Sequence, residues 1–509
     1  MTLIRNFPYC WGATYPHGVN SYSCKSISMR FPLQILAHNV PLKYLCTLSN
    51  LLIIAGIPHR FVNRWNGNTV RVYLGSLNSS HAKKADIAIL YDPTFTIDSL
   101  NKEEIGVLQS SDNGARCIEW VGKAACINIH VVDIAYYLLY VQAFLGEDTA
   151  QLEPVPLKCP LVDRIALFFK NLVLSLFPEL KSLVVPPWPN ERLFAACLTH
   201  DIDILTWGTL ENARRRFRMA FSKGFASLHR AKHLALGFEE IIRGLAGRYR
   251  INCELDLSSW LSIESLKGVK ACYYFAHTLH RDVNDTIYSY EDYVLFGGQK
   301  ITVQNVIGIL SSAGAEIGLH ASIASSKNPK LIKKEKKLLE GVLGGPVFGV
   351  RQHYLRMRYP QTLAAQCSAG FFYDATIGYN RHIGFKAGTS FPYNVACGSS
   401  AFEADVFWEL PFAVQDIAIP DYSKYSEEYA LNHIREIIDE VGSVGGVFSI
   451  LWHNYCAREN SFRSRQKIYQ LIVDELLARR AWIATPKEII THWANRKQKL
   501  TSQCNSYDI

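Results

Sequence analysis

The sequence predicts an α/β protein that contains a large β/α barrel and, before it, a smaller α/β domain. Short apolar runs typical of strands alternate with longer amphipathic runs typical of helices, which is the pattern of a parallel sheet covered by helices. A proline-rich break, VVPPWPNERL, separates two regions with this pattern. The roughly 300 residues that follow the break are enough for a closed or nearly closed barrel.

Composition and charge narrow the class of protein. The 509 residues are 49% hydrophobic and 19% charged, which is typical of a globular protein and excludes wholesale disorder. The net charge of +9 is a mild excess that permits an anionic partner, and we expect no nucleic-acid partner. The 13 cysteines include no CxxC pair, which favours reduced thiols. We therefore expect a cytoplasmic protein with neither a signal peptide nor a membrane-spanning helix, whose contact with a membrane would be peripheral.

The region before the break has its own elements. Residues 1–33 lack periodicity and are expected to form an irregular leader, and residues 34–184 are expected to form the smaller domain. In that domain, TVRVYLG and ADIAILYD have the short β-branched pattern of strands. The runs VVDIAYYLLYVQAFLG and LVDRIALFFKNLVLSLF are long enough for helices.

The region after the break places polar residues at the ends of apolar runs. Residues 185–495 are expected to form the barrel and residues 496–509 a polar tail. The expected strands include FAACLTHDID, AEIGLHAS, VFGVRQHY and GGVFSILWHN. A barrel brings the carboxyl ends of its strands to one rim, where the chemistry of such folds takes place. The polar side chains at these ends are Asp201 and Asp203, His320, Arg351 and His353, and His453.

These residue types suit hydrolytic chemistry. Alternate residues of a strand share a face, so Asp201 and Asp203 should point one way and His200 the other. Two carboxylates at a strand end suit a metal ligand beside a general base, although an aspartate that caps a helix would give the same pattern. A single histidine there is more often structural than a ligand. Burying all these groups together is costly unless they satisfy one another or a metal ion, so the rim is the predicted site.

Six segments resemble, in the same order, the polysaccharide deacetylase superfamily, also called NodB-like or carbohydrate esterase family 4. They are PPWPNERLFAACLTHDIDIL, AEIGLHAS, GVRQHYLRMRYPQT, AGFFYDATIGY, GFKAGTSFPYN and ILWHN. The resemblance is to a bacterial branch with a THDVD-type first motif and a GVRQHYLR segment, and it covers residues 185–495. Two earlier segments, IHVVDIAYYLLYVQAFLGED and LKCPLVDRIALFFKNLVLSLFPEL, are similar to the uncharacterised N-terminal domain of that branch.

The resemblance implies a fold, a cofactor and a reaction. The fold is a distorted (β/α) barrel of the glycoside hydrolase and deacetylase type, and the cofactor is one divalent metal, usually zinc. The reaction removes acetyl groups from an N-acetylated sugar or surface polysaccharide, so the bond cleaved is a carbon–nitrogen bond but not a peptide bond. The roles carried over position by position are Asp201 as general base, Asp203 and His320 as metal ligands, Arg351 as the group that orients the base, and His453 as the acid that protonates the leaving amine.

The sequence departs from the family pattern in two places. Ile202 separates the two aspartates of the first motif, so their roles as base and ligand could be exchanged. Family members also have a second histidine four residues after the first in the second motif, and here that position is Ala324. His353 is the first candidate for the missing metal ligand because it shares a strand face with the motif arginine. His277, at the end of VKACYYFAH, is the second candidate.

Two other functions fit some of the residues. A glycosidase would need two carboxylates about 5–10 Å apart, for which Asp201 with Asp374 or Glu409 is available. A glycan-binding barrel that has lost its metal would explain the missing histidine.

Three features can be interpreted as structural or as functional. Tyr354 and Trp452, near strand ends, could stack on sugar rings or belong to the core. Asp374 could support the site or cap a turn. The basic run ARRRFRM could be a solvated helix face or a contact with an anionic glycan or phospholipid.

Overall fold

The structure is a computed structural model, and its contacts divide the chain into two compact units. The first unit is Met1–Gln142, Pro160–Pro187 and Trp493–Ile509, and the second is Ala143–Cys159 and Trp188–His492. The residues that the structure describes are 33–37, 40–65, 69–76, 78–91, 118–121, 124–127, 130–145, 156–205, 213, 217, 220–221, 227–245, 257–277, 285–286, 288–395, 407–419, 426–454 and 459–502. The expected leader lies outside this part of the chain apart from its last residue.

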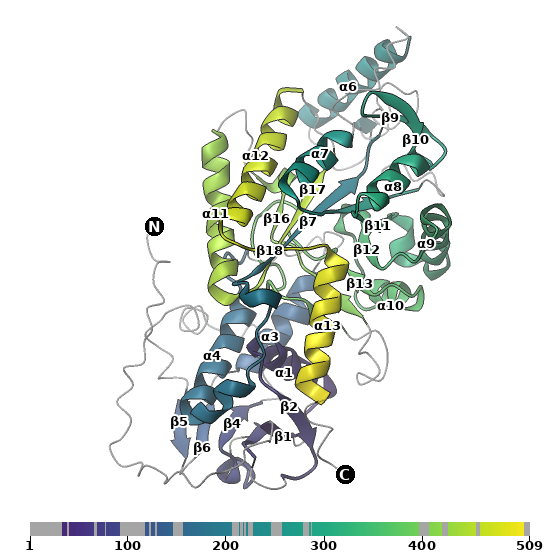
Figure 1. Cartoon of the computed structure of the whole chain (residues 1–509). Helices are drawn as coiled ribbons and strands as arrows, with labels where there is room; N and C mark the ends of the chain where they lie inside the picture. Colours follow the sequence, from purple (N-terminus) through teal and green to yellow (C-terminus); the bar gives the residue numbers. More distant parts are fainter. Residues whose placement is uncertain are drawn as a thin grey trace. The chain divides into compact units, whose positions relative to one another are not determined.

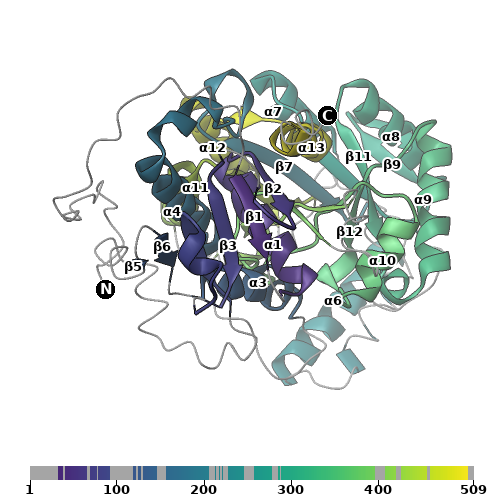
Figure 2. The same cartoon turned by 90° about the horizontal axis from the view of Figure 1, so that it is seen from below.

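The first unit is built on a mainly parallel sheet (Figures 1 and 2). Its strand order is β2-β1-β3-β4-β6-β5, and only the pair of β5 and β6 is antiparallel. The strands are β1 Leu33–Ala37, β2 His59–Val62, β3 Arg71–Gly75, β4 Ile87–Leu90, β5 Ile118–Val121 and β6 Ala124–Ile127. The helices are α1 Leu42–Ala55, α3 Val131–Tyr140 and α4 Leu161–Leu176, with short 3₁₀ turns η1 Ala82–Lys84 and η5 Pro178–Leu183. The turn η4 Gln142–Phe144 begins at the last residue of this stretch of the unit. The two strands and two helices expected from the sequence are therefore confirmed.

A glycine fixes the turn that ends α1. Gly56 has a φ of 75°, in the left-handed region that favours glycine, and its amide donates to Ile53 O. A Cβ at this position would lie 2.5 Å from Val185 O, so a larger residue would displace the backbone. Arg496, which is buried, donates to the carbonyl oxygen of Ile53 at this helix end and to those of Val185 and Pro186.

The second unit is built on a strongly curled parallel sheet. Its order is β14-β15-β13-β12-β11-β8-β7-β17-β16, with β18 paired to β7, and only the pair of β14 and β15 is antiparallel. The strands are β7 Ala195–Ile202, β8 Cys272–Phe275, β11 Glu316–Ala321, β12 Gly349–Gln352, β13 Tyr373–Asp374, β14 Tyr393–Asn394, β15 Trp408–Glu409, β16 Val414–Gln415, β17 Val447–His453 and β18 Trp482–Ile483. Among the described residues no ladder joins β14 to β16, so the barrel is open. The predicted α/β class and distorted barrel are confirmed.

Helices flank this sheet, and a hairpin of β9 and β10 lies apart from it. Figure 1 shows α11 and α12 on one flank and α8 and α9 on the other. The helices are α6 Ser227–Leu245, α7 Ser258–Lys267, α8 Val303–Ser312, α9 Pro329–Leu343, α10 Gln361–Ser368, α11 Glu427–Val444 and α12 Glu459–Ala478. A last helix, α13 Pro486–Ser502, begins in this unit, and its residues from Trp493 onward belong to the first unit. The remaining elements are β9 Tyr293–Phe296, β10 Gln299–Thr302 and the turns η6 Pro189–Glu191, η8 Ala324–Lys327, η9 His353–Leu355 and η10 Asp416–Ala418. The boundary expected at residue 495 lies inside α13. No described helix is both long and apolar enough to cross a bilayer.

The sheet is held by an apolar core that leaves the polar residues at its carboxyl edge. All eight residues of β7 are buried, and α9 and α11 begin with side-chain caps. Asn328 accepts from the amides of Lys330 and Leu331, and Ser426 accepts from the amide of Tyr429, which satisfies donors that a helix start leaves unpaired. These well-anchored helices position the strand ends that carry the candidate site.

Candidate metal centre

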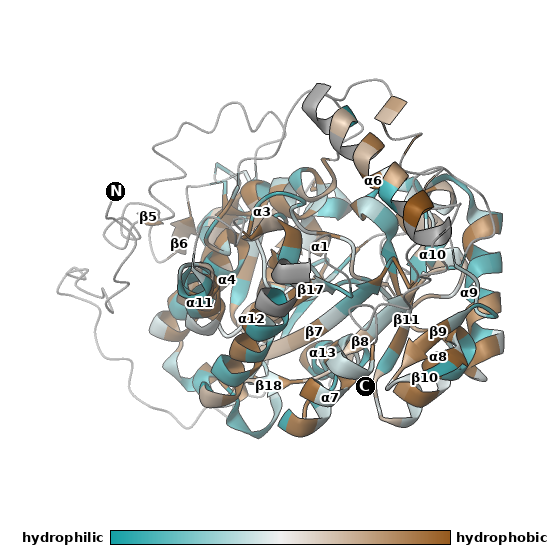
Figure 3. Ribbon diagram, turned by 90° about the horizontal axis from the view of Figure 1, so that it is seen from above, coloured by the Kyte–Doolittle hydropathy of each residue, from teal (hydrophilic) through white to brown (hydrophobic). Residues whose placement is uncertain are grey.

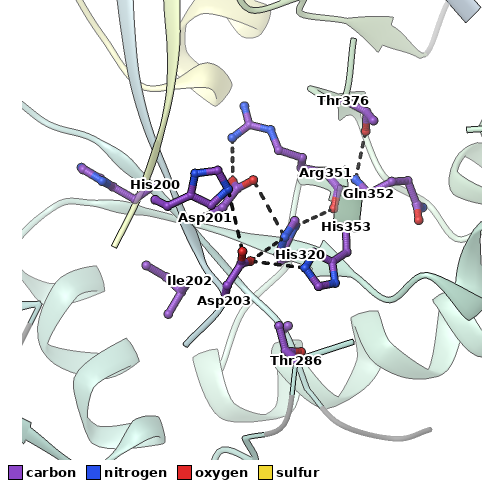
Figure 4. A network of polar contacts seen from close by, with 12 residues as sticks. His200, Asp201, Ile202, Asp203, Thr286, His320, Arg351, Gln352, His353 and Thr376 are labelled. Carbon is purple, nitrogen blue, oxygen red and sulfur yellow. Dashed lines mark hydrogen bonds and ion pairs between the residues drawn. The ribbon is translucent and has the colours of Figure 1, made fainter. Parts of the chain in front are cut away.

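The strand register brings the predicted residues together at one edge of the curled sheet. His453 at the end of β17 pairs in register with Asp201 on β7, and His320 on β11 pairs with Arg351 on β12. His353 follows β12 directly, and its ring lies 4.9 Å from the ring of His320. Because all these strands are parallel, their carboxyl ends carry these side chains to the same edge. Figure 4 shows Asp201, His320, Arg351 and His353 there.

Asp203, one residue past β7, lies at the centre of three imidazoles. Its Oδ1 is 3.1 Å from His320 Nε2 and 3.7 Å from His353 Nε2, and its Oδ2 is 3.8 Å from His453 Nε2. One ligand atom from each of Asp203, His320 and His353 can be chosen so that all three lie within 4.8 Å of one another, and all three residues are buried. The structure therefore groups the three residues predicted as metal ligands.

Hydrogen bonds fix how each imidazole faces Asp203. His320 Nδ1 lies 3.1 Å from the carbonyl oxygen of Arg351, which can only accept, so Nδ1 carries the hydrogen. His353 Nδ1 donates to Asp285 Oδ1 at 2.9 Å, and His453 Nδ1 donates to Asp416 Oδ1 at 2.7 Å. The Nε2 atom of each ring therefore faces Asp203, with a lone pair when the ring is neutral and with a hydrogen when it is protonated. Supporting acceptors of this kind orient metal-binding histidines in proteins.

These residues fit a divalent metal ion. Asp203 Oδ1 accepts no well-formed hydrogen bond although it is buried, and it faces two nitrogens whose free electron pairs would repel it. A cation between them, either a proton or a metal ion, removes that conflict. Two imidazoles and one carboxylate are a donor set that zinc accepts while keeping a position open. Ligands of a tetrahedral zinc lie about 3.3 Å apart, which is close to the separations observed.

Asp201 is held differently from Asp203. Arg351 donates from Nη1 to Asp201 Oδ1 at 2.7 Å and to Thr199 Oγ1 at 2.8 Å, and from Nε to the carbonyl oxygen of Ala375 at 2.7 Å. The guanidinium is fully buried and lies over the ring of Tyr274, 4.4 Å from its centroid. Asp201 is therefore fixed by a cation, whereas Asp203 is surrounded by imidazole nitrogens. This difference favours Asp203 as the ligand and leaves Asp201 available as a base.

The buried charges shift the pKa values at the centre. Burial alone would raise the pKa of Asp203, but His353, His320 and His453 outweigh it and hold that pKa well below its usual value. Burial alone would lower the pKa of His453, but the charge of Asp416 and its hydrogen bond raise it to about 9. The pKa of His320 is also raised, because Asp201 and Asp203 outweigh the effect of burial.

Two supporting carboxylates of the centre were not singled out from the sequence. Asp285 accepts from His353 and, through Oδ2, from the amide of Ile323 at 2.9 Å. Asp416 accepts from His453 and from Arg465 Nη1 at 2.6 Å. Asp416 could have been found from the sequence, because it follows the largely apolar run ELPFAVQ in the same way that the predicted site residues follow their strands. Asp285 follows no such run, so no comparable signal marks it.

The structure places Ala324, the position at which the resemblance leads one to expect a second histidine, in a turn. Ala324 is the first residue of the η8 turn, and the segment before it is tied to Asp285 through the amide of Ile323. His353 faces Asp203 from the neighbouring strand end instead. His277, the second candidate, packs edge-on against Tyr290 at 4.7 Å and is not among the grouped ligands.

The remaining candidates have structural surroundings. His200 points away from the centre, as predicted, and lies 2.9 Å from Glu264 Oε1. Trp452 is fully buried and packs against Tyr469, so it belongs to the core. Tyr354 is 45% exposed, with its ring 4.4 Å from that of His353, so stacking on a sugar ring stays a prediction for this side chain. Of the basic run ARRRFRM, the arginines lie outside the described residues.

The carboxylates considered for a glycosidase are enclosed. Asp374 is fully buried and accepts from Gln366 and from both the amide and the hydroxyl of Thr376, as a turn-capping aspartate does. Glu409 is also fully buried, and it accepts from the amide of Ile377. Burial and the neighbouring Asp374 raise the pKa of Glu409 well above its usual value. The hydrogen bonds of both carboxylates are therefore made within the core, as those of structural carboxylates are.

Comparisons with known proteins find similar solved structures. No protein-family model matches the chain, and no curated protein matches it. A protein from Mycobacterium smegmatis, assigned provisionally as a polysaccharide deacetylase, has 18% identity and a TM-score of 0.40, with 62% of this chain and 95% of that chain covered. An allantoinase has 13% identity and a TM-score of 0.40, with 62% and 96% covered.

A third similar structure is a pseudoenzyme. This carbohydrate esterase family 4 protein from Bacillus anthracis has 11% identity and a TM-score of 0.30, with 60% of this chain and 66% of that chain covered. At these identities and TM-scores the likeness does not show a shared activity. The function therefore has to be inferred from the residues of the centre.

Proposed function

We propose that the chain is a metal-dependent hydrolase that removes the acetyl group from an N-acetylated sugar or surface polysaccharide. The observation that carries the proposal is the convergence of three oriented imidazoles on Asp203, next to a second carboxylate held by an arginine. The resemblance of the sequence motifs to polysaccharide deacetylases supports the choice of substrate class. A cytoplasmic location stays a prediction from the cysteine usage.

The proposed ligands are Asp203, His320 and His353, and zinc is the first candidate for the metal. A divalent ion bound there would polarise the acetyl carbonyl and lower the pKa of a bound water. Cleavage of the amide by water needs a base for the water proton and an acid for the leaving nitrogen. The chain has one group for each task beside the proposed ligands.

Asp201 is the proposed base. Arg351 holds Oδ1, so Oδ2 is the oxygen that is left to accept the proton of the attacking water. Oδ2 lies 3.8 Å from His320 Nε2, next to the proposed ligands. Because Arg351 makes three hydrogen bonds from a fully buried position, it keeps the base in one orientation.

His453 is the proposed acid. Asp416 accepts the hydrogen of Nδ1 and so leaves Nε2 as the atom that gives its proton to the amine as acetate departs. The raised pKa of His453 keeps the ring protonated before that step. Arg465 donates to the other oxygen of Asp416, which fixes the carboxylate behind the ring.

Acetate release from N-acetylated sugars tests the proposal. The metal-loaded chain should release acetate from at least one of a panel of N-acetylglucosamine oligomers and polymers. Asp201→Asn should lower kcat by about 10²–10⁴-fold while metal content stays unchanged. Asp439→Asn is the matched control, because Asp439 is an exposed carboxylate paired with Arg479 on the surface, and it should leave kcat unchanged.

Two results would contradict the proposal. If the metal-loaded chain released no acetate from any of these sugars, the barrel would be better explained as a glycan-binding module. If acetate were released equally well by Asp201→Asn, the base would have been assigned to the wrong carboxylate.

A further inference from the structure

Helix α6 carries a line of apolar side chains that face solvent. Ala231, Ala235, Phe238 and Ile242 are all exposed, and Phe238 and Ile242 are 59% and 66% exposed. Their spacing of four, three and four residues places them in one stripe along the helix, about 16 Å long. Exposed apolar residues are common one at a time, but a continuous stripe on a helix marks an interaction surface.

The side of α6 that carries Gly237 packs against Phe217. Gly237 is buried, and the ring of Phe217 lies against it so closely that a Cβ would come within 2.9 Å of the ring. Phe217 also meets Phe238 edge-on at 5.2 Å, yet most of Phe238 stays exposed. Figure 3 shows α6 set apart from α7 and α8.

The sequence around α6 is strongly basic. Residues 206–250 contain ten Lys and Arg and three Glu, a net charge of +7, whereas the whole chain has +9. One tenth of the chain therefore carries most of its excess positive charge. Arg230 and Phe221, which is 75% exposed, lie in the same segment. Apolar side chains combined with a local excess of Lys and Arg are the composition of helices that lie in the interface of anionic membranes.

We propose that α6 docks the protein peripherally on a membrane surface that contains anionic lipids, with Phe238 and Ile242 inserted among the lipid chains. The charge decides the choice of partner, because a second copy of this basic segment would be repelled and an anionic lipid surface attracts it. The segment follows β7 directly, and β7 carries Asp201. The inference does not depend on the proposed hydrolysis, since membrane binding can be measured without substrate.

Co-sedimentation of the full chain with lipid vesicles tests this inference. The vesicles are phosphatidylcholine mixed with phosphatidylglycerol, compared with phosphatidylcholine alone, at about 0.15 M salt. The variants are Phe238→Ser with Ile242→Ser, and the matched control is Leu266→Ser, because Leu266 is 86% exposed on α7 outside the stripe. Thermal unfolding of each variant verifies that it is folded.

The expected result is binding to the mixed vesicles that exceeds binding to phosphatidylcholine alone. The double variant should lower the partition coefficient by at least about 10-fold, and Leu266→Ser should leave it unchanged. Absence of binding to mixed vesicles, or binding that the folded double variant retains, would overturn the inference. Light scattering that shows a dimer of the wild type, dissociated by the double variant, together with no vesicle binding, would assign the stripe to a second copy instead.

Discussion

Replacement of Arg351 tests how the proposed base is held. Arg351→Met removes the cation that lies 2.7 Å from Asp201 Oδ1 and leaves a buried carboxylate without its ion-pair partner. Arg351→Lys keeps a positive charge, but a single ammonium cannot reach Asp201, Thr199 and the carbonyl oxygen of Ala375 together. The two variants therefore separate the effect of charge from the effect of geometry.

The magnitude follows from what each variant leaves unpaired. Removing one partner of a buried ion pair costs about 3–5 kcal/mol in the free energy of unfolding, which is the expectation for Arg351→Met. In Arg351→Lys the charge remains and the main loss is a buried carbonyl without its donor, which costs about 1–3 kcal/mol. Adding Asp201→Asn to Arg351→Met removes the unpaired charge, so the double variant should recover part of the stability.

Urea unfolding of the four proteins at neutral pH measures these differences. The expected order of stability is wild type, Arg351→Lys, then Arg351→Met, with the double variant more stable than Arg351→Met alone. Equal loss in the two single variants would refute the claim that charge pairing holds Asp201. So would a double variant that is no more stable than Arg351→Met, because removal of the unpaired charge would then have restored nothing.

Three further predictions concern other buried groups. Burial lowers the pKa of His59 to about 4, so the neutral ring is compatible with the fold above pH 6.5, and its protonation destabilises the fold as pH falls towards 4. The free energy of unfolding should therefore be about 2 kcal/mol lower at pH 5 than at pH 7.5. His59→Asn should abolish that part of the pH dependence, as measured by urea unfolding. Asp416→Asn should lower kcat for acetate release at least about 10-fold with little change in KM. An unchanged kcat would show that Asp416 does not support His453 as the proposed acid. Glu409→Gln should change the unfolding free energy at pH 7 by less than about 1 kcal/mol, because the raised pKa already keeps that carboxyl neutral; a loss of several kcal/mol in urea unfolding would show that Glu409 is charged.

The polar residues at the strand ends could be predicted because each strand and the residues that follow it lie in one short stretch of sequence. The run FAACLTHDID contains both its apolar strand and the polar residues that follow, and the alternation of a strand places Asp201 and His200 on opposite faces. The same local pattern predicted that His320, Arg351 and His453 lie at the carboxyl ends of their strands. The fold class was predictable for the same reason, since the alternation of strands and helices is a local property.

The supporting residues could not be predicted because their contacts join distant parts of the chain. Asp285 lies 68 residues from His353, and Asp416 lies 37 residues from His453. Nothing in the local sequence distinguishes such a carboxylate from one that caps a turn, as Asp374 does. Trp452 shows the opposite case, because its position beside a site histidine suggested sugar stacking while strand alternation turns its ring into the core.

Metal content of the purified chain tests the central claim most directly. Elemental analysis should find about one zinc-like ion per chain, lost in Asp203→Asn, His320→Ala and His353→Ala. His277→Ala is the control and should keep its metal, because His277 lies outside the grouped ligands. A wild-type chain that holds no ion after metal is added back, or a His353→Ala variant that keeps a full ion, would contradict the proposed centre.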